Sequence, residues 1–124
     1  MKHVRFDDAE VETPADGWRR AGLMSRDAVS VDWFEKPPGH TSAKHSHENE
    51  QVFVILTGTL VLHTEQEAVT LKPFDTAWVD AWEEHWSENP GSEPTTGLNI
   101  FAPGREFPYW SKGEQPKPNR KTGP

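Results

Sequence analysis

The stretch HSHENEQ, residues 45–51, decides how this sequence is interpreted, and the apolar run VFVILTG at 52–58 follows it directly. In an extended chain, residues two apart point to the same side, so His45 and His47 project together and Gln51 shares their parity. Two imidazoles on one side of a chain are a common start of a site for Zn, Fe, Ni, Mn or Cu. Taken alone, such a pair more often represents surface polar residues ahead of a strand.

Strand signals dominate the rest of the sequence. Alternating or β-branched runs, separated by Gly, Pro, Asn and Asp, occur at 28–35, 52–64, 68–73, 75–81 and 96–103. The run 52–64 is interpreted as two strands joined at Thr57-Gly58. No segment keeps a helical period over ten residues. Six or so short strands of this kind predict an all-β sandwich or barrel.

The composition limits the possible classes of protein. The chain has 124 residues, enough for one domain with a single core, and it contains no cysteine, which excludes disulfides, thiolate metal sites and a cysteine nucleophile. A net charge of −7 argues against nucleic-acid binding. Because we find neither a signal peptide nor a run of about 20 apolar residues, we expect a cytoplasmic protein that does not bind a membrane.

We expect one domain over residues 1–110 and a disordered tail over 111–124. The tail carries four basic residues and one acidic residue, is rich in Pro, and has no large apolar side chain. It is interpreted as an end without a structural role, the alternative being a basic arm that contacts a partner.

The spacing around the two histidines resembles a known family motif. From Gly39, five residues lead to His45, one to His47, three to Gln51 and six to Gly58. This resembles the first motif of the cupin superfamily, in which a glutamate usually stands at the position of Gln51.

A second motif of the same superfamily, G-x5-P-x-G-x2-H-x3-N, matches in spacing. The register is Phe74, Asp80, Trp82, His85 and Asn89, which keeps the histidine and the asparagine and replaces both glycines and the proline. The resemblance implies an all-β double-stranded β-helix jelly roll, the cupin barrel, with one metal at its mouth.

The resemblance implies one divalent transition metal, Zn, Ni, Mn or Fe, as the cofactor. The ligands that it implies are His45, His47, Gln51 and His85. Glutamine binds through a neutral carbonyl oxygen, so the ion keeps its full charge and attracts an anionic small molecule. A shift of one residue makes Glu50 the ligand instead, and this alternative stays open.

The segment NIFAPGRE at 99–106 resembles a late D-x-F-x-P-x-R pattern of one group of small cupins, which linearise unsaturated uronates released from pectin or alginate. The resemblance implies catalytic roles for Asn99, Phe101 and Arg105. Arg105 holds a substrate carboxylate in a bidentate pair, or is a structural clamp on a loop. Asn99 departs from the pattern, because an amide cannot exchange protons as a carboxylate does. Either the chemistry differs, another group takes this role, or catalysis is lost. The candidates are Glu50, Glu106 and Tyr109.

Apolar residues around these motifs predict packing. Phe53 and Ile55 share parity with Gln51 and are expected to line the barrel lumen. The tryptophans near His85 are expected in the core or a dimer interface rather than stacked on a substrate; they are Trp78, Trp82 and Trp86. The opposite face of the strand needs cover from a second sheet or subunit, and we expect a homodimer. That face consists of Val52, Val54 and Leu56.

Three functions stay open, because the fold alone does not decide among them. The first is a metal-dependent lyase or isomerase acting on a small carboxylated sugar or related organic acid. The second is an Fe- or Cu-dependent dioxygenase, since three neutral histidines suit Fe(II). The third is a non-catalytic module that binds a metabolite or a metal, which the substitution at Asn99 favours.

Overall fold

The computed structural model describes residues 1–107, and within them the chain is almost entirely β-structure, which confirms the predicted all-β class. The elements are η1 (Phe6–Asp8), β1 (Glu12–Ala15), β2 (Trp18–Ser25), β3 (Ser30–Lys36), β4 (Glu50–Thr57), β5 (Leu60–Thr64), β6 (Ala68–Leu71), β7 (Thr76–Val79), β8 (His85–Glu88) and β9 (Thr95–Ala102). The tail predicted at 111–124 lies outside the described residues, as do the last residues of the expected 1–110 domain.

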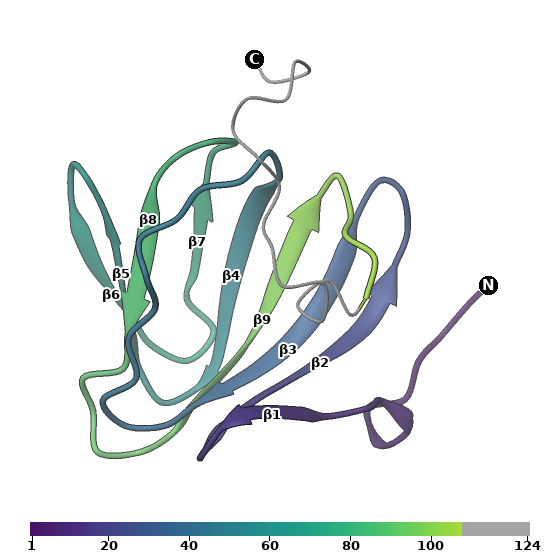
Figure 1. Cartoon of the computed structure of the whole chain (residues 1–124), viewed down its shortest axis with the longest axis horizontal. Coiled ribbons are helices and arrows are strands. Elements are labelled where there is room, and N and C mark those ends of the chain that lie inside the picture. Colours follow the sequence, from purple (N-terminus) through teal and green to yellow (C-terminus); the bar gives the residue numbers. More distant parts are fainter. Residues whose placement is uncertain (108–124) are drawn as a thin grey trace.

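The strands form two sheets that face each other (Figure 1). The larger sheet has the order β1-β2-β3-β9-β4-β7 and the smaller one β6-β5-β8, and all pairs are antiparallel. Strand β9 lies between β3 and β4, so the end of the domain completes the centre of the larger sheet. This arrangement is the double-stranded β-helix jelly roll that the sequence predicts.

Six of the nine described strands coincide with the predicted runs. Gly58, with a φ of 77°, occupies the predicted turn between β4 and β5, where a left-handed conformation favours glycine. Strands β1, β2 and β8 were not predicted. The sequences of β2 and β8, WRRAGLMS and HWSE, lack β-branched residues. β2 is extended because it forms a hairpin with β3, and β8 because it pairs with β5 across the fold; the residue types of β2 and β8 alone do not reveal this pairing.

The core lies between the two sheets. Burial alternates along β4, where Phe53 and Ile55 are buried and the flanking Val52 and Val54 are half-buried on the other face. The core cluster comprises Phe34, Phe53, Ile55, Leu60, Leu62, Leu71 and Val79. Each such side chain contributes about 1.5–3 kcal/mol when it is fully buried, so this cluster holds the sheets together.

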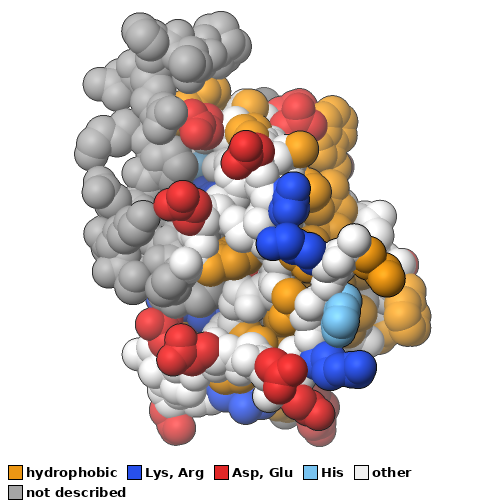
Figure 2. Space-filling model, turned by 90° about the vertical axis from the view of Figure 1, so that its right-hand side faces the viewer, with side chains coloured by type: hydrophobic (Ala, Val, Ile, Leu, Met, Phe, Trp, Pro, Cys, Tyr) orange, Lys and Arg blue, Asp and Glu red, His pale blue; other side chains and the backbone are white. Residues whose placement is uncertain are grey.

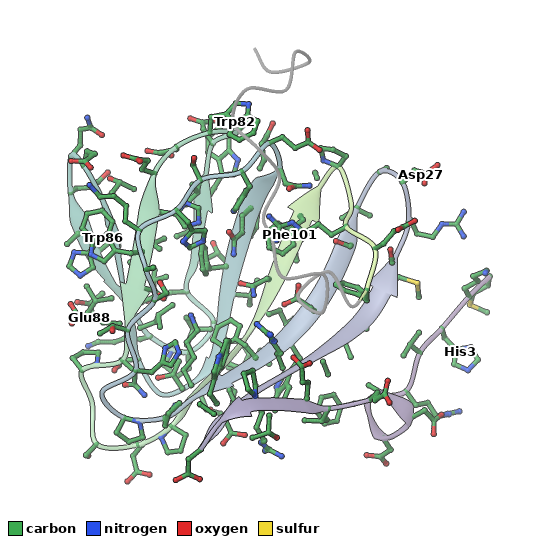
Figure 3. The ribbon with its side chains drawn as sticks, viewed as in Figure 1. His3, Asp27, Trp82, Trp86, Glu88 and Phe101 are labelled. Carbon is green, nitrogen blue, oxygen red and sulfur yellow. The ribbon has the colours of Figure 1, made fainter. Side chains whose placement is uncertain are left out.

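The tryptophans near His85 are not core residues. Trp78 is 60% exposed, and the ring of Trp86 stacks on His63 with a centroid distance of 5.1 Å. In Figure 3, Trp82 and Trp86 lie at the periphery of the molecule, whereas Phe101 lies in its middle. Core packing is therefore a wrong prediction for these residues, because Trp78 and Trp86 occupy outward positions of β7 and β8.

The molecular surface is mixed in character. Figure 2 shows acidic, basic and hydrophobic side chains interspersed on one side of the molecule. Exposed hydrophobic residues of the N-terminal segment include Val4, Phe6 and Val11. No helix within residues 1–107 has the length and apolar character needed to cross a membrane. The homodimer expected from the outer face of β4 stays a prediction.

Candidate metal centre

His45 and His85 lie opposite each other because the loop before β4 runs antiparallel to β8. The N–H of His45 donates to the carbonyl oxygen of His85 at 3.1 Å, and the N–H of His85 donates to that of His45 at 2.9 Å. A second bridge joins Thr41 to Glu88. Backbone pairing thus fixes His45 although the residue is not part of a strand, which corrects the expectation that both histidines of the pair lie on one extended strand.

A bend at 48–49 separates His47 from β4. Beyond the bend, Gln51 is buried on the inner face of β4, whereas Glu50 is exposed. The carboxylate of Glu50 accepts a hydrogen bond from Nε1 of Trp78 at 3.0 Å. The structure therefore directs Gln51, and not Glu50, toward the histidines.

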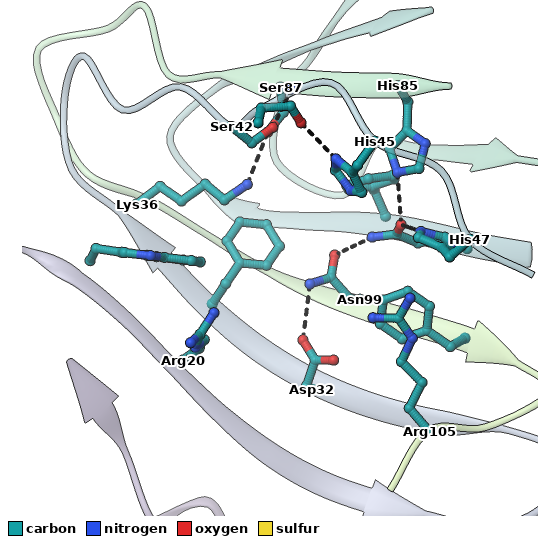
Figure 4. Close-up of a pocket in the computed structure, with 16 residues that line it drawn as sticks. Arg20, Asp32, Lys36, Ser42, His45, His47, His85, Ser87, Asn99 and Arg105 are labelled. Carbon is teal, nitrogen blue, oxygen red and sulfur yellow. Dashed lines mark hydrogen bonds between the residues drawn. The ribbon is translucent and has the colours of Figure 1, made fainter. Parts of the chain in front are cut away.

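The three histidines converge on one point. One ring nitrogen of each lies within 4.8 Å of those of the other two. His45 is half-buried, while His47 and His85 are fully buried. Oε1 of Gln51 lies 3.1 Å from Nε2 of His47 and 3.2 Å from Nε2 of His85 (Figure 4). The structure thus brings together all four residues that the sequence resemblance implies as ligands.

Backbone carbonyl groups set the tautomer of each imidazole. The Nδ1 atoms of His45, His47 and His85 lie 2.7, 2.9 and 2.8 Å from the carbonyl oxygens of Ala43, Asn49 and Glu83. A carbonyl oxygen only accepts, so each Nδ1 carries a hydrogen and donates it. In a neutral imidazole, Nε2 then holds a lone pair, and this is the state that binds metal ions.

Burial keeps these imidazoles neutral. It lowers the pKa of His47 to about 3 and the pKa of His85 to about 4, and the positive charge of Arg105 acts in the same direction. Burial also lowers the pKa of His45. At neutral pH, the lone pairs at Nε2 are therefore available.

The donor set fits a divalent transition metal. Oε1 of Gln51 is an acceptor, and so are the Nε2 atoms of His47 and His85, although they lie only 3.1 and 3.2 Å away. Acceptors this close repel each other unless a cation lies among them. Three imidazoles and one amide oxygen are ligands that Zn, Ni, Fe and Cu accept.

A chain of hydrogen bonds that ends at Asp32 orients the amide of Gln51. Nε2 of Gln51 donates to Oδ1 of Asn99 at 2.9 Å, and Nδ2 of Asn99 donates to Oδ1 of Asp32 at 2.9 Å. Because an ionised carboxylate only accepts, Asn99 presents its NH2 group to Asp32 and its oxygen to Gln51. Oε1 of Gln51 is then left to face the histidines.

Arg105 lies beside this cluster and is buried, with 7% of its surface exposed. Its Nε donates to Oδ1 of Asn49 at 3.1 Å, and its Cζ lies 4.1 Å from the centre of the Phe101 ring. Asn99 and Phe101 project from the same face of β9. The structure thus places the three residues predicted to be catalytic around the same site as the histidines.

A cavity of about 330 Å³ contains these side chains, a volume at the lower end for small-molecule sites. Its aromatic wall comes from Trp18, Phe34, Phe53 and Phe101. Three charged lining residues were not identified from the sequence; they are Arg20, Asp32 and Lys36. Asp32 and Lys36 share parity with Phe34 on β3. Charged residues at inward positions of an alternating strand are rare without a partner or a function, and this was the available signal.

Comparison with known proteins agrees with this architecture. Residues 32–101 match the family model described as Cupin domain. No curated protein matches the chain. Among solved structures, KdgF from Halomonas sp. superimposes with a TM-score of 0.78 at 16% identity, covering 86% of this chain and 96% of that one.

Two further structures are similar. An RmlC-like cupin from Shewanella frigidimarina has a TM-score of 0.76 at 20% identity, with 86% of this chain and 95% of that chain covered. A predicted oxalate decarboxylase from Thermotoga maritima has a TM-score of 0.69 at 25% identity, with 82% and 98% covered. The likeness to the Halomonas and Shewanella proteins shows the fold alone.

Proposed function

Because this chain belongs to the cupin domain family, we propose that it is a metal-dependent lyase or isomerase that acts on a small carboxylated sugar or a related organic acid. One observation carries the proposal: a neutral set of metal-ligand atoms and the guanidinium of Arg105 line the same small cavity. Such a site combines a Lewis acid with a carboxylate anchor.

The residues that would hold one divalent transition metal are His45, His47, Gln51 and His85. When bound, the ion polarises a carbonyl or hydroxyl oxygen of the substrate. All four ligands are neutral, so the centre keeps its positive charge and favours an anionic ligand over a neutral one.

Arg105 would bind the carboxylate of the substrate. Asn49 fixes its Nε, and Phe101 packs against the plane of its guanidinium. A guanidinium held in this way is oriented before the ligand arrives, so less side-chain entropy is lost when a bidentate pair forms.

The proton transfer is assigned to Asp32. Glu50 and Glu106 are exposed and do not line the cavity, and Tyr109 lies outside the described residues. Asp32 lines the cavity next to Asn99 and is a carboxylate. Its Oδ1 accepts from Asn99, and we assign to this carboxylate the acceptance of a proton from the substrate.

The test is turnover of an unsaturated uronate by protein loaded with Ni, Mn or Zn, without oxygen. The proposal predicts consumption of the substrate, loss of activity in Asp32→Asn even when its metal content is verified to equal that of the wild type, and a raised KM in Arg105→Lys, which keeps the charge but loses the planar fork. Glu50→Gln is the matched control and should behave as the wild type. An absolute requirement for oxygen supports a dioxygenase instead, and tight binding without turnover supports a non-catalytic module.

A further inference from the structure

Lys36 is a buried cation on the inner face of β3. It is 8% exposed, its Nζ donates to Oγ of Ser87 at 2.9 Å, and it lies 5.0 Å from the centre of the Phe34 ring. Within residues 1–107 it forms no ion pair. An ammonium group has three donors, and the hydroxyl of Ser87 takes one of them. A buried charge with so few partners costs stability unless a counter-charge joins it.

Lys36 and Arg105 enter the cavity from different sides. Figure 4 shows Asn99 between them, and both line the cavity that holds the histidines. Asp32 is the only carboxylate among the described lining residues, against the cations Lys36 and Arg105; the third cationic lining residue, Arg20, pairs with Glu12. The ligands of the candidate metal centre are neutral. The cavity is therefore positive even before an ion is counted.

We propose that this cavity takes a small dicarboxylate, with one carboxylate on Arg105 and the other on Lys36. The inference rests on the proposed function and narrows the class of its substrate. A monoanion on Arg105 leaves Lys36 with Asp32 as its nearby opposite charge and without an ion pair, whereas a dianion brings a second carboxylate to Lys36. Burial lowers the pKa of Lys36 to about 8 and the charge of Asp32 opposes this shift, so the ammonium form still dominates at pH 7.

Titration calorimetry at pH 7 tests the proposal on metal-loaded and on metal-free protein. The probes are dicarboxylates of three to six carbons, each compared with its own monoamide, which keeps the length and loses one charge. In the wild type, the best dicarboxylate should bind about 10-fold more tightly than its monoamide, the equivalent of one charge-assisted hydrogen bond. Lys36→Met should abolish this preference and leave monoamide binding unchanged.

Lys44→Met is the matched control. Lys44 is an exposed lysine that pairs with Glu65 outside the cavity, so the same change of charge should leave the preference intact. Thermal unfolding separates a binding role from a structural one. Lys36→Met should be at least as stable as the wild type, because it removes a buried charge; a structural role predicts a loss of stability.

The outcomes distinguish this inference from the proposed function. The wild type could bind the dicarboxylate and its monoamide equally, with both weakened in Arg105→Lys. That result overturns the carboxylate site at Lys36 and leaves the proposed function standing. A preference that persists in Lys36→Met also overturns it. If no carboxylate binds to protein whose metal content has been verified, both proposals are wrong.

Discussion

Oε1 of Gln51 lies 3.1 Å from Nε2 of His47, and neither atom carries a hydrogen. The hydrogen of His47 is on Nδ1, where the carbonyl of Asn49 accepts it. The NH2 group of Gln51 is directed to Asn99. The fold therefore holds two acceptors against each other, and a cation converts that repulsion into two ligand bonds. The site is organised before an ion binds.

Asp32→Asn should weaken metal binding. An asparagine at this position can donate as well as accept, so it no longer fixes the orientation of the Asn99 amide, and Gln51 loses its enforced direction. We expect metal affinity to fall about 10- to 100-fold, as it does when other residues that orient a metal ligand by hydrogen bonding are mutated. Competition with a chromophoric chelator measures it.

Glu35→Gln is the control for that experiment. Glu35 lies on the same strand, faces outward and pairs with Arg19. The same carboxylate-to-amide change there should leave metal affinity unchanged. Equal affinities of wild type and Asp32→Asn, with the fold intact by circular dichroism, would show that Asp32 does not orient the ligand.

Phe74→Gly should stabilise the protein. Phe74 has a φ of 71°, in the left-handed region that disfavours L side chains, and it is 79% exposed, so removing its ring loses little burial. We expect a gain of about 1 kcal/mol in the free energy of unfolding, measured in urea. Phe74→Ala keeps the Cβ and should give no gain. A destabilised glycine variant contradicts this view of the turn.

The second motif shows what sequence reasoning captures and what it misses. Phe74 and Trp82 stand where the family motif has glycines, and both keep positive φ values, 71° and 63°. The left-handed backbone is therefore present at both positions although the residue types have changed, and the sequence analysis did not predict it. His85 and Asn89 keep the residue types of the motif, and Asn89 braces the loop by donating to the carbonyls of Lys36 and Glu93.

Lys36 should make stability depend on pH at the alkaline end. Its pKa is about 8 in the folded protein against 10.5 as the reference value. Between these values the unfolded chain holds a proton that the folded chain lacks, so stability rises with pH. The destabilising effect of Lys36 is complete below pH 8 and disappears by about 10.5. The slope is at most about 1.4 kcal/mol per pH unit.

Urea unfolding of metal-free wild type and Lys36→Met at pH 7, 8, 9 and 10 measures this effect. The variant should be the more stable protein at pH 7, and the difference should shrink as the pH rises. Among the groups that face Lys36, burial lowers the pKa values of His40, His45 and His85, which moves their titration further below this window. A difference that stays constant from pH 7 to 10 contradicts the assignment.

The spacing of His45, His47 and Gln51 is local and could be read from the sequence, whereas His85 and the ligand set as a whole came from the resemblance to the two family motifs. Asp32 and Lys36 were not identified, because their roles depend on strand pairing. Asp32 meets Asn99 only through the register of β3 on β9, across 67 positions of the chain. Trp18 was not identified for a similar reason, because it reaches the cavity from β2, a strand without a β-type sequence pattern.

The central claim is that the histidine cluster and Gln51 hold one divalent transition metal. Elemental analysis of untagged protein prepared without chelators tests it most directly, with His85→Ala as the matched variant. The account predicts about one transition metal per chain in the wild type and none in the variant, with the β-sheet spectrum retained in both. Wild-type protein that holds no metal, even after reloading, would contradict it.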